Sequence, residues 1–376
     1  MPGSPSPRIS VVVPVYNVGA FLDQCLESIS AQTARDIEII CLNDGSTDNS
    51  LAIMERHAAV DGRIVVVDKG NEGYGATCNR GFELATGEYL AIVEPDDYLR
   101  ATMFEDLLAF ADSFSQPVDI VKEAWFDVIG WDDPRNERVV PGYLYRRLKT
   151  TGEPQTIEAV PELLEGHPSI WSALYRRGFL EDNGIRFREY PGAGWADNPF
   201  LVDTLCRAKS IVYVDSMHYC YRNELPRIGD TPADEGRLSL PLLRWMEMTD
   251  DLHACGVEDR GVWHAHYQRG FNYIDTVIEQ GGWGIPSVRD RIRQLFTAMR
   301  EDLVLDHPKL SPAKKRFYLE QTGGDSNRRI SSLPYVRHLA HEFVVRLRAQ
   351  GVAGACGALG RFSLGRAPKE RAEKVK

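Results

Sequence analysis

Short apolar runs alternate with amphipathic segments over the first third of the chain. Apolar and β-branched residues dominate positions 9–13, 37–42, 64–67 and 89–93, and each run has the length of a buried strand. Between these runs, apolar side chains recur every three or four residues, which is the spacing of one helix face. Strands that alternate with helices in this way form a parallel sheet covered by helices, so the pattern predicts an α/β fold.

The pattern becomes less regular beyond residue 100. Residues 130–165 are rich in Pro, Gly and charged residues, and no helix or strand is predicted there. The other elements expected before residue 225 are a helix at 102–113, a strand at 119–121, a strand at 170–175, a helix at 176–183 and a strand at 211–214. Gly87 and Gly184 are each expected to end a helix.

The character of the sequence changes after about residue 225. Strand signals disappear there, and Trp, His and Leu recur at helical spacing. This change predicts three parts, which are an α/β domain over residues 8–225, a mainly helical C-terminal region over 226–350, and a basic, flexible tail over 351–376.

Composition narrows the function classes. Of the 376 residues, 43% are hydrophobic and 26% are charged, which is ordinary for a globular protein. The net charge of −10 argues against a dedicated nucleic-acid-binding protein. The seven cysteines are odd in number and form no CxxC pair, so neither a disulfide framework nor a zinc site is expected. The N-terminus has no apolar signal core and no apolar run reaches about 18 residues, so the chain is expected to be cytoplasmic.

The charge is distributed unevenly along the chain. Residues 327–376 contain 11 Lys and Arg against 3 Asp and Glu, a local charge of +8 that leaves −18 on the remainder. One predicted helix face there carries Val336, Ala340, Phe343 and Leu347, and an adjacent face carries Arg337, His341 and Arg348. Such a helix can hold a protein at the inner face of the cell membrane. The alternative is that the apolar face packs on the protein and the basic end is a disordered tail.

Polar motifs follow the first four predicted strands. The segments are Pro14 to Asn17, Asp44, Asp68 to Asn71, and Glu94 to Asp97. Ligands of open α/β sheets bind beyond the carboxyl ends of the strands. We therefore expect these four motifs to converge on one crevice.

The last of these motifs, Glu94-Pro95-Asp96-Asp97, places three carboxylates within four residues. Clustered carboxylates repel one another unless a cation lies between them. Oxygen ligands suit Mg²⁺ or Mn²⁺, which usually share their coordination shell with substrate phosphates. The alternative is a solvated turn that opens a helix, where acidic residues are also favourable.

Two further motifs have both a binding and a structural interpretation. Asp44 could accept hydrogen bonds from a nucleobase or ribose, or belong to a capped turn. Gly73 and Gly75 precede a predicted helix, so their backbone amides could face a phosphate. They do not form a dinucleotide fingerprint, because the third glycine position is Cys78, and the chain has no GxxxxGK[ST] loop.

Asp197 lies beside Trp195, where partial desolvation would raise its pKa and make it a better general base. The alternative is that Asp197 caps a helix over residues 199–208. His218 has two interpretations as well, a metal ligand or a histidine at the end of a strand, and the strand position fits its neighbours better.

Ordered motifs in the first half of the chain resemble those of family 2 glycosyltransferases. They are residues 9–17 (ISVVVPVYN), 43–48 (NDGSTD), 71–73 (NEG) with 79–81 (NRG), 85–89 (ATGEY) and 94–97 (EPDD). The resemblance implies a nucleotide-diphospho-sugar transferase fold of the GT-A type, a Rossmann-like, mostly parallel sheet, here followed by a mainly helical C-terminal region. It also implies transfer of the sugar with inversion.

The resemblance assigns roles to individual residues. Pro14, Tyr16 and Asp44 would line the nucleoside pocket, Asp96 would bind Mn²⁺ or Mg²⁺, and Asp197 would be the general base. The other motif residues expected to bind substrate are Asn17, Asn71, Gly73, Asn79, Glu94 and Asp97. Three positions depart from the family pattern, where Glu94 replaces an Asp, Ala196 replaces a Glu and Cys78 replaces an Arg.

The function implied is transfer of a sugar from a nucleotide-diphosphate sugar, expected to be a UDP-sugar, to a hydroxyl group. The acceptor would be a glycan or lipid-linked glycan in cell-surface polysaccharide or glycoconjugate synthesis. The Ala196 departure supports an alternative, a sugar-nucleotide-binding protein without catalysis. A nucleotidyltransferase is disfavoured because the loop after the first strand, at residues 14–19, has no Lys or Arg to hold a triphosphate.

Overall fold

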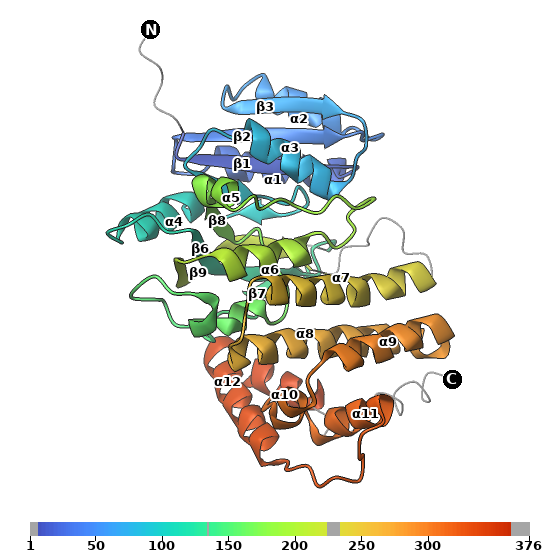
Figure 1. Ribbon diagram of the computed structural model, residues 1–376. Coiled ribbons are helices and arrows are strands. Elements are labelled where there is room, and N and C mark those ends of the chain that lie inside the picture. The colour runs from blue at the N-terminus through green and yellow to red at the C-terminus, as the bar shows by residue number, and fades with distance from the viewer. Residues whose placement is uncertain (1–6, 134, 224–233, 362–376) are drawn as a thin grey trace. The chain divides into compact units, whose positions relative to one another are not determined.

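The computed structural model describes residues 7–133, 135–223 and 234–361 (Figure 1). Contacts within the chain divide it into two units. Unit 1 comprises residues 1–160 and 167–225, and unit 2 comprises residues 161–166 and 226–376. The predicted α/β class and the helical C-terminal region are confirmed.

Unit 1 is built on one sheet of nine strands. They are β1 (Ile9–Val15), β2 (Ile37–Asp44), β3 (Ile64–Lys69), β4 (Tyr89–Ile92), β5 (Tyr98–Leu99), β6 (Ile120–Ile129), β7 (Arg138–Pro141), β8 (Ala173–Arg176) and β9 (Ile211–Arg222). The order is β3-β2-β1-β4-β8-β6-β9-β5, with β7 beside β6. Strands β1 to β4 are mutually parallel, and β8 runs antiparallel between β4 and β6.

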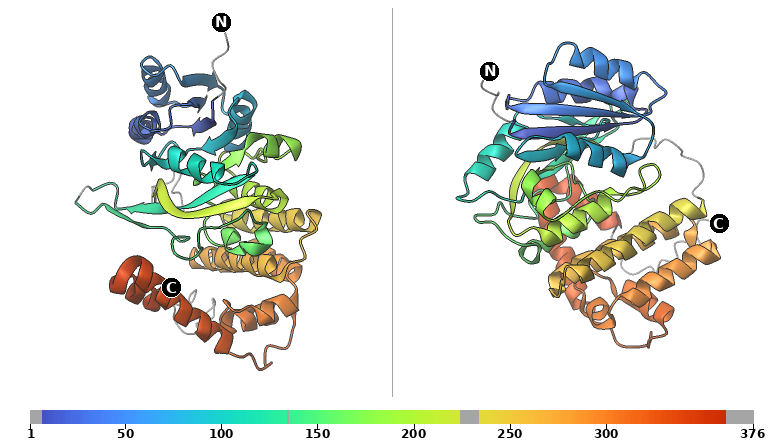
Figure 2. Two further views of the ribbon diagram at one scale, coloured as in Figure 1. Left: turned by 90° about the vertical axis from the view of Figure 1, so that its left-hand side faces the viewer. Right: turned by 45° about the horizontal axis from the view of Figure 1, so that its top comes forward.

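Helices cover both faces of the parallel half of the sheet. Figure 2 shows α1 (Gly19–Ser30) and α2 (Ser50–Ala58) on one face of β1 to β4 and α3 (Tyr74–Leu84) on the other. Every residue of β1 is buried as a result, which explains why this strand is a continuous apolar run rather than an alternating one. The other α-helices of unit 1 are α4 (Met103–Asp112), α5 (Arg177–Asp182) and α6 (Asp197–Arg207), and η1 (Ile157–Ala159) is a 3₁₀ turn.

The strands of the second half are longer than predicted. β6 has 10 residues and β9 has 12, where three and four were expected. Polar residues such as Glu123 and His218 interrupt their apolar runs, and the β6–β9 register shifts at Glu123 and Ala124. The short strands β5 and β7 were not predicted, since two to four residues carry little periodic signal.

Unit 2 is helical throughout the residues described. Its α-helices are α7 (Glu235–Ala254), α8 (Arg260–Glu279), α9 (Pro286–Ala298), α10 (Glu301–Asp306), α11 (Pro312–Thr322) and α12 (Leu333–Arg361), with 3₁₀ turns η2 (Pro161–Leu164) and η3 (Gly282–Gly284). Side chains of Asp234, Asp259 and Ser311 cap α7, α8 and α11 by accepting backbone N–H bonds. The buried rings of Trp245 and His266 stack at 4.4 Å and join α7 to α8.

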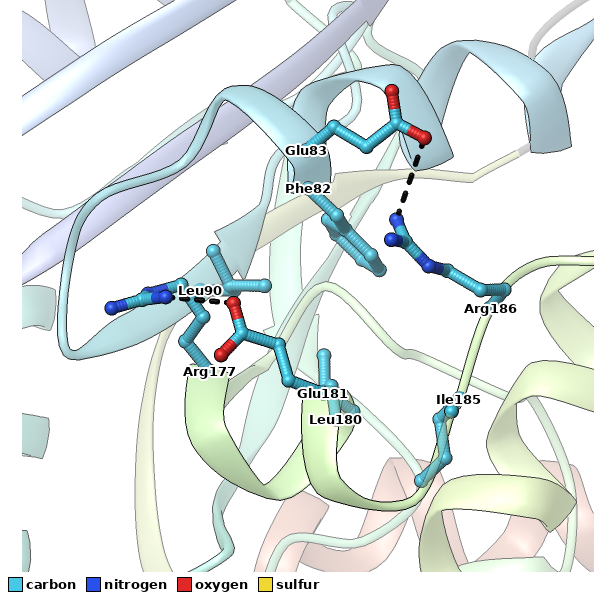
Figure 3. A pocket seen from close by; sticks show the side chains of 9 residues that line it. Phe82, Glu83, Leu90, Arg177, Leu180, Glu181, Ile185 and Arg186 are labelled. Atoms are coloured by element: carbon cyan, nitrogen blue, oxygen red, sulfur yellow. Dashed lines mark hydrogen bonds and ion pairs between the residues drawn. The ribbon is translucent and has the colours of Figure 1, made fainter.

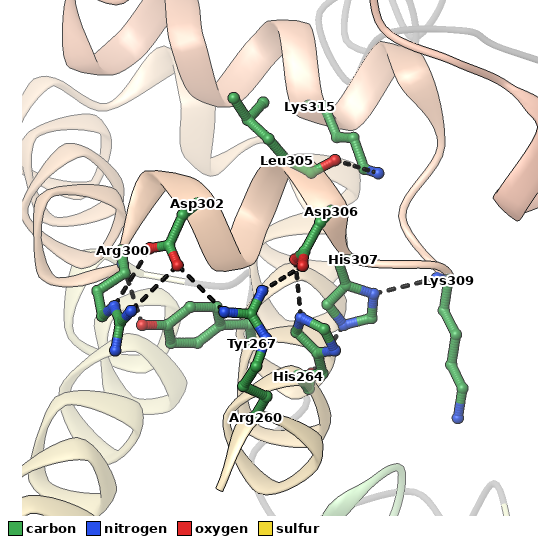
Figure 4. Close-up of polar contacts among 10 residues, drawn as sticks. All are labelled: Arg260, His264, Tyr267, Arg300, Asp302, Leu305, Asp306, His307, Lys309 and Lys315. Carbon is green, nitrogen blue, oxygen red and sulfur yellow. Dashed lines mark hydrogen bonds and ion pairs between the residues drawn. The ribbon is translucent and has the colours of Figure 1, made fainter. Parts of the chain in front are cut away.

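A network of polar side chains joins α8 to α10 (Figure 4). Arg260 pairs with Asp302 at 3.3 Å and also with Asp306, and these exposed pairs contribute little individually. The buried His307 lies beside Asp306 and His264 in this network. Its Nδ1 accepts from the Lys309 amide at 3.0 Å and its Nε2 contacts the His264 carbonyl at 2.8 Å, while burial lowers its pKa to about 3. His307 is therefore a neutral structural residue.

Helix α12 breaks at Gly351, where φ is 71° and ψ is −170°. The helix resumes and is described as far as Arg361, and the rest of the segment expected to be a basic tail lies outside the described residues. Among the helices that the structure describes, none is long and apolar enough to cross a membrane.

The prediction that Gly87 ends a helix was wrong, whereas Gly184 follows α5 with a left-handed φ of 61° as expected. α3 ends at Leu84, and its cap Ala85 is extended. Gly87 instead lies against β1, where its amide donates to Ser10 Oγ at 2.8 Å. A Cβ at position 87 would lie 2.6 Å from the Ser10 backbone nitrogen, so close backbone approach requires glycine there.

We predict that Gly87→Ala destabilises unit 1 by about 1–3 kcal/mol, because backbone atoms of β1 must move to admit the methyl group. Urea unfolding followed by circular dichroism measures the change. Gly62→Ala is the matched control, since a Cβ at Gly62 has no neighbour within 4 Å and should change stability by less than about 0.5 kcal/mol. Equal stability of the two variants would contradict the packing argument.

Candidate active site

The loops after β1 and β2 are tied together at the carboxyl edge of the sheet. Asn17 adopts a left-handed φ of 51°, and its side-chain oxygen accepts from the Thr47 amide at 2.7 Å. Its own amide donates to Ser46 Oγ at 3.0 Å, and Asp48 accepts from the Gly19 amide at 2.9 Å. Asn17 thus holds the loops in place, while the neighbouring Tyr16 is left 43% exposed at the end of β1.

Asp44, the last residue of β2, is buried and holds the loop after β3. The ladder places it opposite Lys69, whose ammonium group donates to its carboxylate, and the amides of Glu72 and Gly73 donate at 2.8 and 3.0 Å. Burial raises the pKa of Asp44, but the bonds from Lys69 and the Glu72 amide outweigh it and leave the pKa below its ordinary value. Asn71 completes the loop by donating to the Asp44 carbonyl at 3.0 Å.

The start of α3 packs closely against residues 187–192, a segment much later in the chain. Gly73 has a left-handed φ of 93°, and a Cβ there would lie 2.6 Å from the Tyr190 carbonyl oxygen. At Gly75 a Cβ would lie 2.3 Å from the Arg188 carbonyl oxygen. The amides of Gly73 and Tyr74 donate to Asp44 and to the Gly192 carbonyl, so the structure uses them within the protein rather than directing them toward a phosphate.

Asn79 holds the same segment from inside α3. It is buried, and its side-chain amide both donates to and accepts from the backbone of Phe187, each at 2.9 Å. Both hydrogen-bonding groups of this expected substrate residue are therefore engaged with the protein, and Asn79 shapes the site by placing residues 187–192.

The three carboxylates after β4 occupy different environments. Glu94 is half-buried, and its Oε1 accepts from the Tyr74 hydroxyl at 2.5 Å. Burial and then repulsion by Asp96 raise the pKa of Glu94 to about 8, with a further contribution from Asp197. The contribution of Asp197 to the pKa of Glu94 means that Asp197 lies close enough to the loop after β4 to interact with it electrostatically.

Asp97 is buried and acts as an anchor for β9. Its two oxygens accept from the Tyr219 hydroxyl at 2.9 Å and from the Arg222 amide at 2.7 Å. Tyr219 also accepts from the Glu94 amide at 3.0 Å, and its ring stacks on Trp171 at 4.0 Å. Burial, followed by repulsion from Asp96, raises the pKa of Asp97 well above its usual range. Asp97 was expected to bind substrate, but both of its carboxylate oxygens accept hydrogen bonds from the protein.

Asp96 is half-buried between these two neighbours. The Arg222 guanidinium donates to the Asp96 carbonyl and to Gln24, and lies 5.1 Å from the Phe21 ring and 5.2 Å from the Tyr98 ring. Arg222 therefore holds the backbone of the loop that contains Asp96.

The donor set bears on the expected metal ion. Within the described residues, no group of three or more His, Cys, Asp and Glu side chains is arranged to hold a metal. A single carboxylate such as Asp96, combined with substrate phosphates, is a common arrangement for Mg²⁺. Burial and then repulsion from Asp96 raise the pKa values of Glu94 and Asp97, and a divalent cation beside Asp96 would offset that repulsion. The residues present therefore fit a cation that is shared with a diphosphate.

Asp197 is the first residue of α6, two residues earlier than the expected start of this helix. Gly192, Gly194 and Trp195 before it all have left-handed φ values, which turn the chain sharply into the helix. Asp197 raises the pKa values of Glu94, Tyr74 and Cys78, so the structure brings it together with the β4 loop and the start of α3.

Lys69 lies in the predicted segment Asp68 to Asn71 but was given no role of its own, and Tyr74, Tyr219 and Arg222 were missed from the sequence. Lys69 had a detectable signal, because it ends a strand at the same edge as Asp44. The others had none, since their partners are 20 to 126 residues away along the chain.

A cavity of about 350 Å³ opens elsewhere in unit 1 (Figure 3). It lies between the end of α3, the start of β4, and α5 with the residues that follow it, and its lining includes Phe82, Leu90, Arg177 and Arg186. The start of β4 is at the opposite edge of the parallel strands from Glu94. This cavity is therefore separate from the site built by the carboxyl ends.

His218 holds β9 to its neighbours behind the site. Its Nδ1 lies 2.8 Å from the buried Glu123 carboxylate in β6, and its Nε2 lies 3.0 Å from Asp106 in α4. Burial lowers the pKa of His218, but the two carboxylates outweigh it and leave the pKa above 6.5. The structure thus places His218 inside a strand, between two acids.

The comparisons with known proteins concern the same region. The model of the glycosyl transferase family 2 matches residues 10–182. The chain is 33% identical to the glycosyltransferase EpsJ of Bacillus subtilis over 246 residues, which cover 62% of this chain and 67% of that protein. It is 31% identical to the glycosyltransferase YibD of Escherichia coli over 264 residues, covering 66% of this chain and 72% of that protein.

Solved structures share the fold. Residues 1–349 of S. aureus TarS, crystallised in complex with UDP, match with a TM-score of 0.63, 20% identity and 92% coverage of both chains. The same part of TarS in complex with UDP-GlcNAc matches with a TM-score of 0.61.

We predict that His218→Gln destabilises the protein most at low pH. The folded-state pKa is raised, so charged His218 stabilises the fold below pH 6.5, and this contribution disappears as the pH rises through the folded-state pKa. The loss should be about 2 kcal/mol at pH 5.5 and should shrink by pH 9, as measured by urea unfolding at each pH. His341→Gln, on an exposed helix face, is the control. A loss that grows with pH would contradict the assignment.

Proposed function

Since the chain belongs to glycosyl transferase family 2, we propose that it transfers the sugar of a UDP-sugar, with inversion, to a hydroxyl group of a glycan or lipid-linked glycan. The proposed setting is the synthesis of a cell-surface polysaccharide or glycoconjugate. The observation that carries this proposal is that Tyr74, at the start of α3, links the two acidic segments: its hydroxyl donates to Glu94 after β4, and its amide donates to the Gly192 carbonyl in the turn that leads to Asp197.

Asp197 is proposed as the general base. It would take the proton from the acceptor hydroxyl while that oxygen attacks the anomeric carbon, and the bond from this carbon to the diphosphate oxygen would break with its electron pair leaving on UDP. Repulsion among neighbouring carboxylates favours uptake of a proton within this cluster. The strained turn before α6 would hold the carboxylate in one position for this step.

The nucleoside is proposed to bind at the ends of β1 and β2. Pro14 lies near the end of β1 and Tyr16 directly follows the strand, where its exposed ring offers an aromatic face to a base. Asp44 and Asn71 form the floor beside them. The TarS complexes with UDP and UDP-GlcNAc support UDP as the carrier, because TarS shares this fold.

A divalent cation, Mn²⁺ or Mg²⁺, is proposed to bind at Asp96 together with the diphosphate, where it would neutralise the negative charge of the leaving group. Glu94 and Asp97 would flank this site, and Arg222 would hold the loop. An anionic donor entering a group of three carboxylates needs such compensation, since the ammonium of Lys69 is already engaged by Asp44.

One observation favours a second candidate, a protein that binds a sugar nucleotide without transferring the sugar. Ala196 stands where the family pattern has a Glu, and it is buried directly before Asp197. The site therefore has one acid fewer than the pattern predicts. Turnover measurements distinguish the two candidates.

The donor can be identified by thermal shift with UDP-, GDP-, CDP- and dTDP-sugars, because a ligand of the folded state raises the melting temperature. With that donor, Asp197→Asn should reduce the rate of UDP release by about 10²–10⁴-fold and leave donor affinity almost unchanged. Asp203→Asn is the matched control on the same helix, where Asp203 pairs with Arg207 at 2.6 Å. If Asp203→Asn lost activity and Asp197→Asn kept it, the base would be misassigned. A wild-type protein that binds donor without releasing UDP would support the second candidate.

Asp96→Ala should abolish the enhancement of UDP binding by Mn²⁺ while leaving the circular dichroism spectrum unchanged. Titration calorimetry with UDP in the presence and absence of Mn²⁺ measures this enhancement. Asp36→Ala removes an exposed carboxylate elsewhere in unit 1 and should behave like the wild type. The same enhancement in Asp96→Ala and the wild type would rule out Asp96 as the metal ligand.

A further inference from the structure

Helix α12 is the red helix in Figures 1 and 2. It carries an apolar stripe that is open to solvent. The exposed fractions are 54% for Leu333, 47% for Val336, 42% for Val344 and 38% for Leu347. These are four of the eight large hydrophobic residues that are exposed in the described part of the chain. Their spacing places them on one face of the helix, with the exposed Ala340 between them. Phe343, which the sequence also assigned to this face, is half-buried.

A basic stripe runs directly beside the apolar one. Arg337, His341 and Arg348 are exposed, and each follows a residue of the apolar stripe by one position. The acidic residue in this part of the helix, Glu342, is buried and lies 3.6 Å from Arg346. Among residues 333–349, the solvent-facing side of α12 therefore combines apolar and cationic groups without a carboxylate.

We propose that this face of α12 binds the anionic lipid surface of a membrane. Charge complementarity selects this partner, because residues 327–376 carry +8 on a chain whose remainder carries −18. A helix of this kind lies in the plane of the interface, with its apolar stripe at the acyl boundary and its basic residues among the headgroups. The inference does not rest on the proposed enzymatic function.

A second copy of the chain fits this face less well. A symmetric dimer brings the same patch of two copies together. The basic stripes that carry Arg337 and Arg348 would then lie close together, and like charges would repel. An anionic lipid surface satisfies both stripes at once.

The test is co-sedimentation of the full chain with vesicles of phosphatidylcholine containing about 30% phosphatidylglycerol, beside vesicles of phosphatidylcholine alone. We expect binding to the anionic vesicles at low salt and release at high salt. Removing two arginines with Arg337→Gln/Arg348→Gln should lower the partition coefficient about 25-fold, since each contributes about 5-fold. The control Arg35→Gln/Arg138→Gln removes the same charge from exposed positions in unit 1 and should retain binding.

The apolar stripe has its own matched pair of variants. Val344→Gln/Leu347→Gln should reduce binding, whereas Val60→Gln/Val65→Gln, at the exposed valines of unit 1, should not. Circular dichroism confirms that each variant is folded. The proposal would be overturned if the wild type did not bind anionic vesicles, or if the α12 variants bound them as well as the wild type does. It would also be overturned if sedimentation velocity showed that the wild type is a dimer, that the α12 variants are monomers, and that neither binds vesicles.

Discussion

Three carboxylates within four residues at the end of a buried strand repel one another, and much of the site is organised around this constraint. Each carboxylate lies in a different environment. Asp97 is buried against the Tyr219 hydroxyl and the Arg222 amide, and Glu94 accepts from the Tyr74 hydroxyl. Asp96 stays half-buried between them, with its backbone held by Arg222. The strands β4 and β9 and the start of α3 are thereby tied to one loop, and the charge that remains uncompensated is concentrated where a cation and a diphosphate are proposed to bind.

In the same loops, motif residues contribute to the site indirectly, by holding the backbone around it in place. Asn17, Asn71 and Asn79 were expected to bind substrate, yet each side chain holds a neighbouring segment of unit 1. An unsatisfied amide or carboxylate in a crowded, partly buried crevice would be costly, so the loops satisfy one another before any ligand arrives. The groups proposed to meet the substrate directly, namely Tyr16, Asp96 and Asp197, lie at the ends of this framework.

The sequence predicted what depends on local pattern and missed what depends on distant partners. Strands β1 to β4 were predicted to within a few residues, because a parallel sheet buried on both faces leaves nearly continuous apolar runs, and helices were predicted between them. The lengths of β6 and β9 could not be predicted, since Glu123 and His218 look like loop residues until they pair across the sheet. The role of Asp97 was equally hidden, because it follows from a tyrosine 122 residues later.

The uneven charge also constrains how the chain could meet a membrane. A remainder that carries −18 is repelled by anionic lipid, and this repulsion is screened over about 8 Å at physiological ionic strength. The basic stripe of α12 is effective only within a similar distance of the surface. Attraction would therefore exceed repulsion only when this face of the helix lies against the lipid, so attachment through α12 would also set the orientation of unit 2 on the membrane.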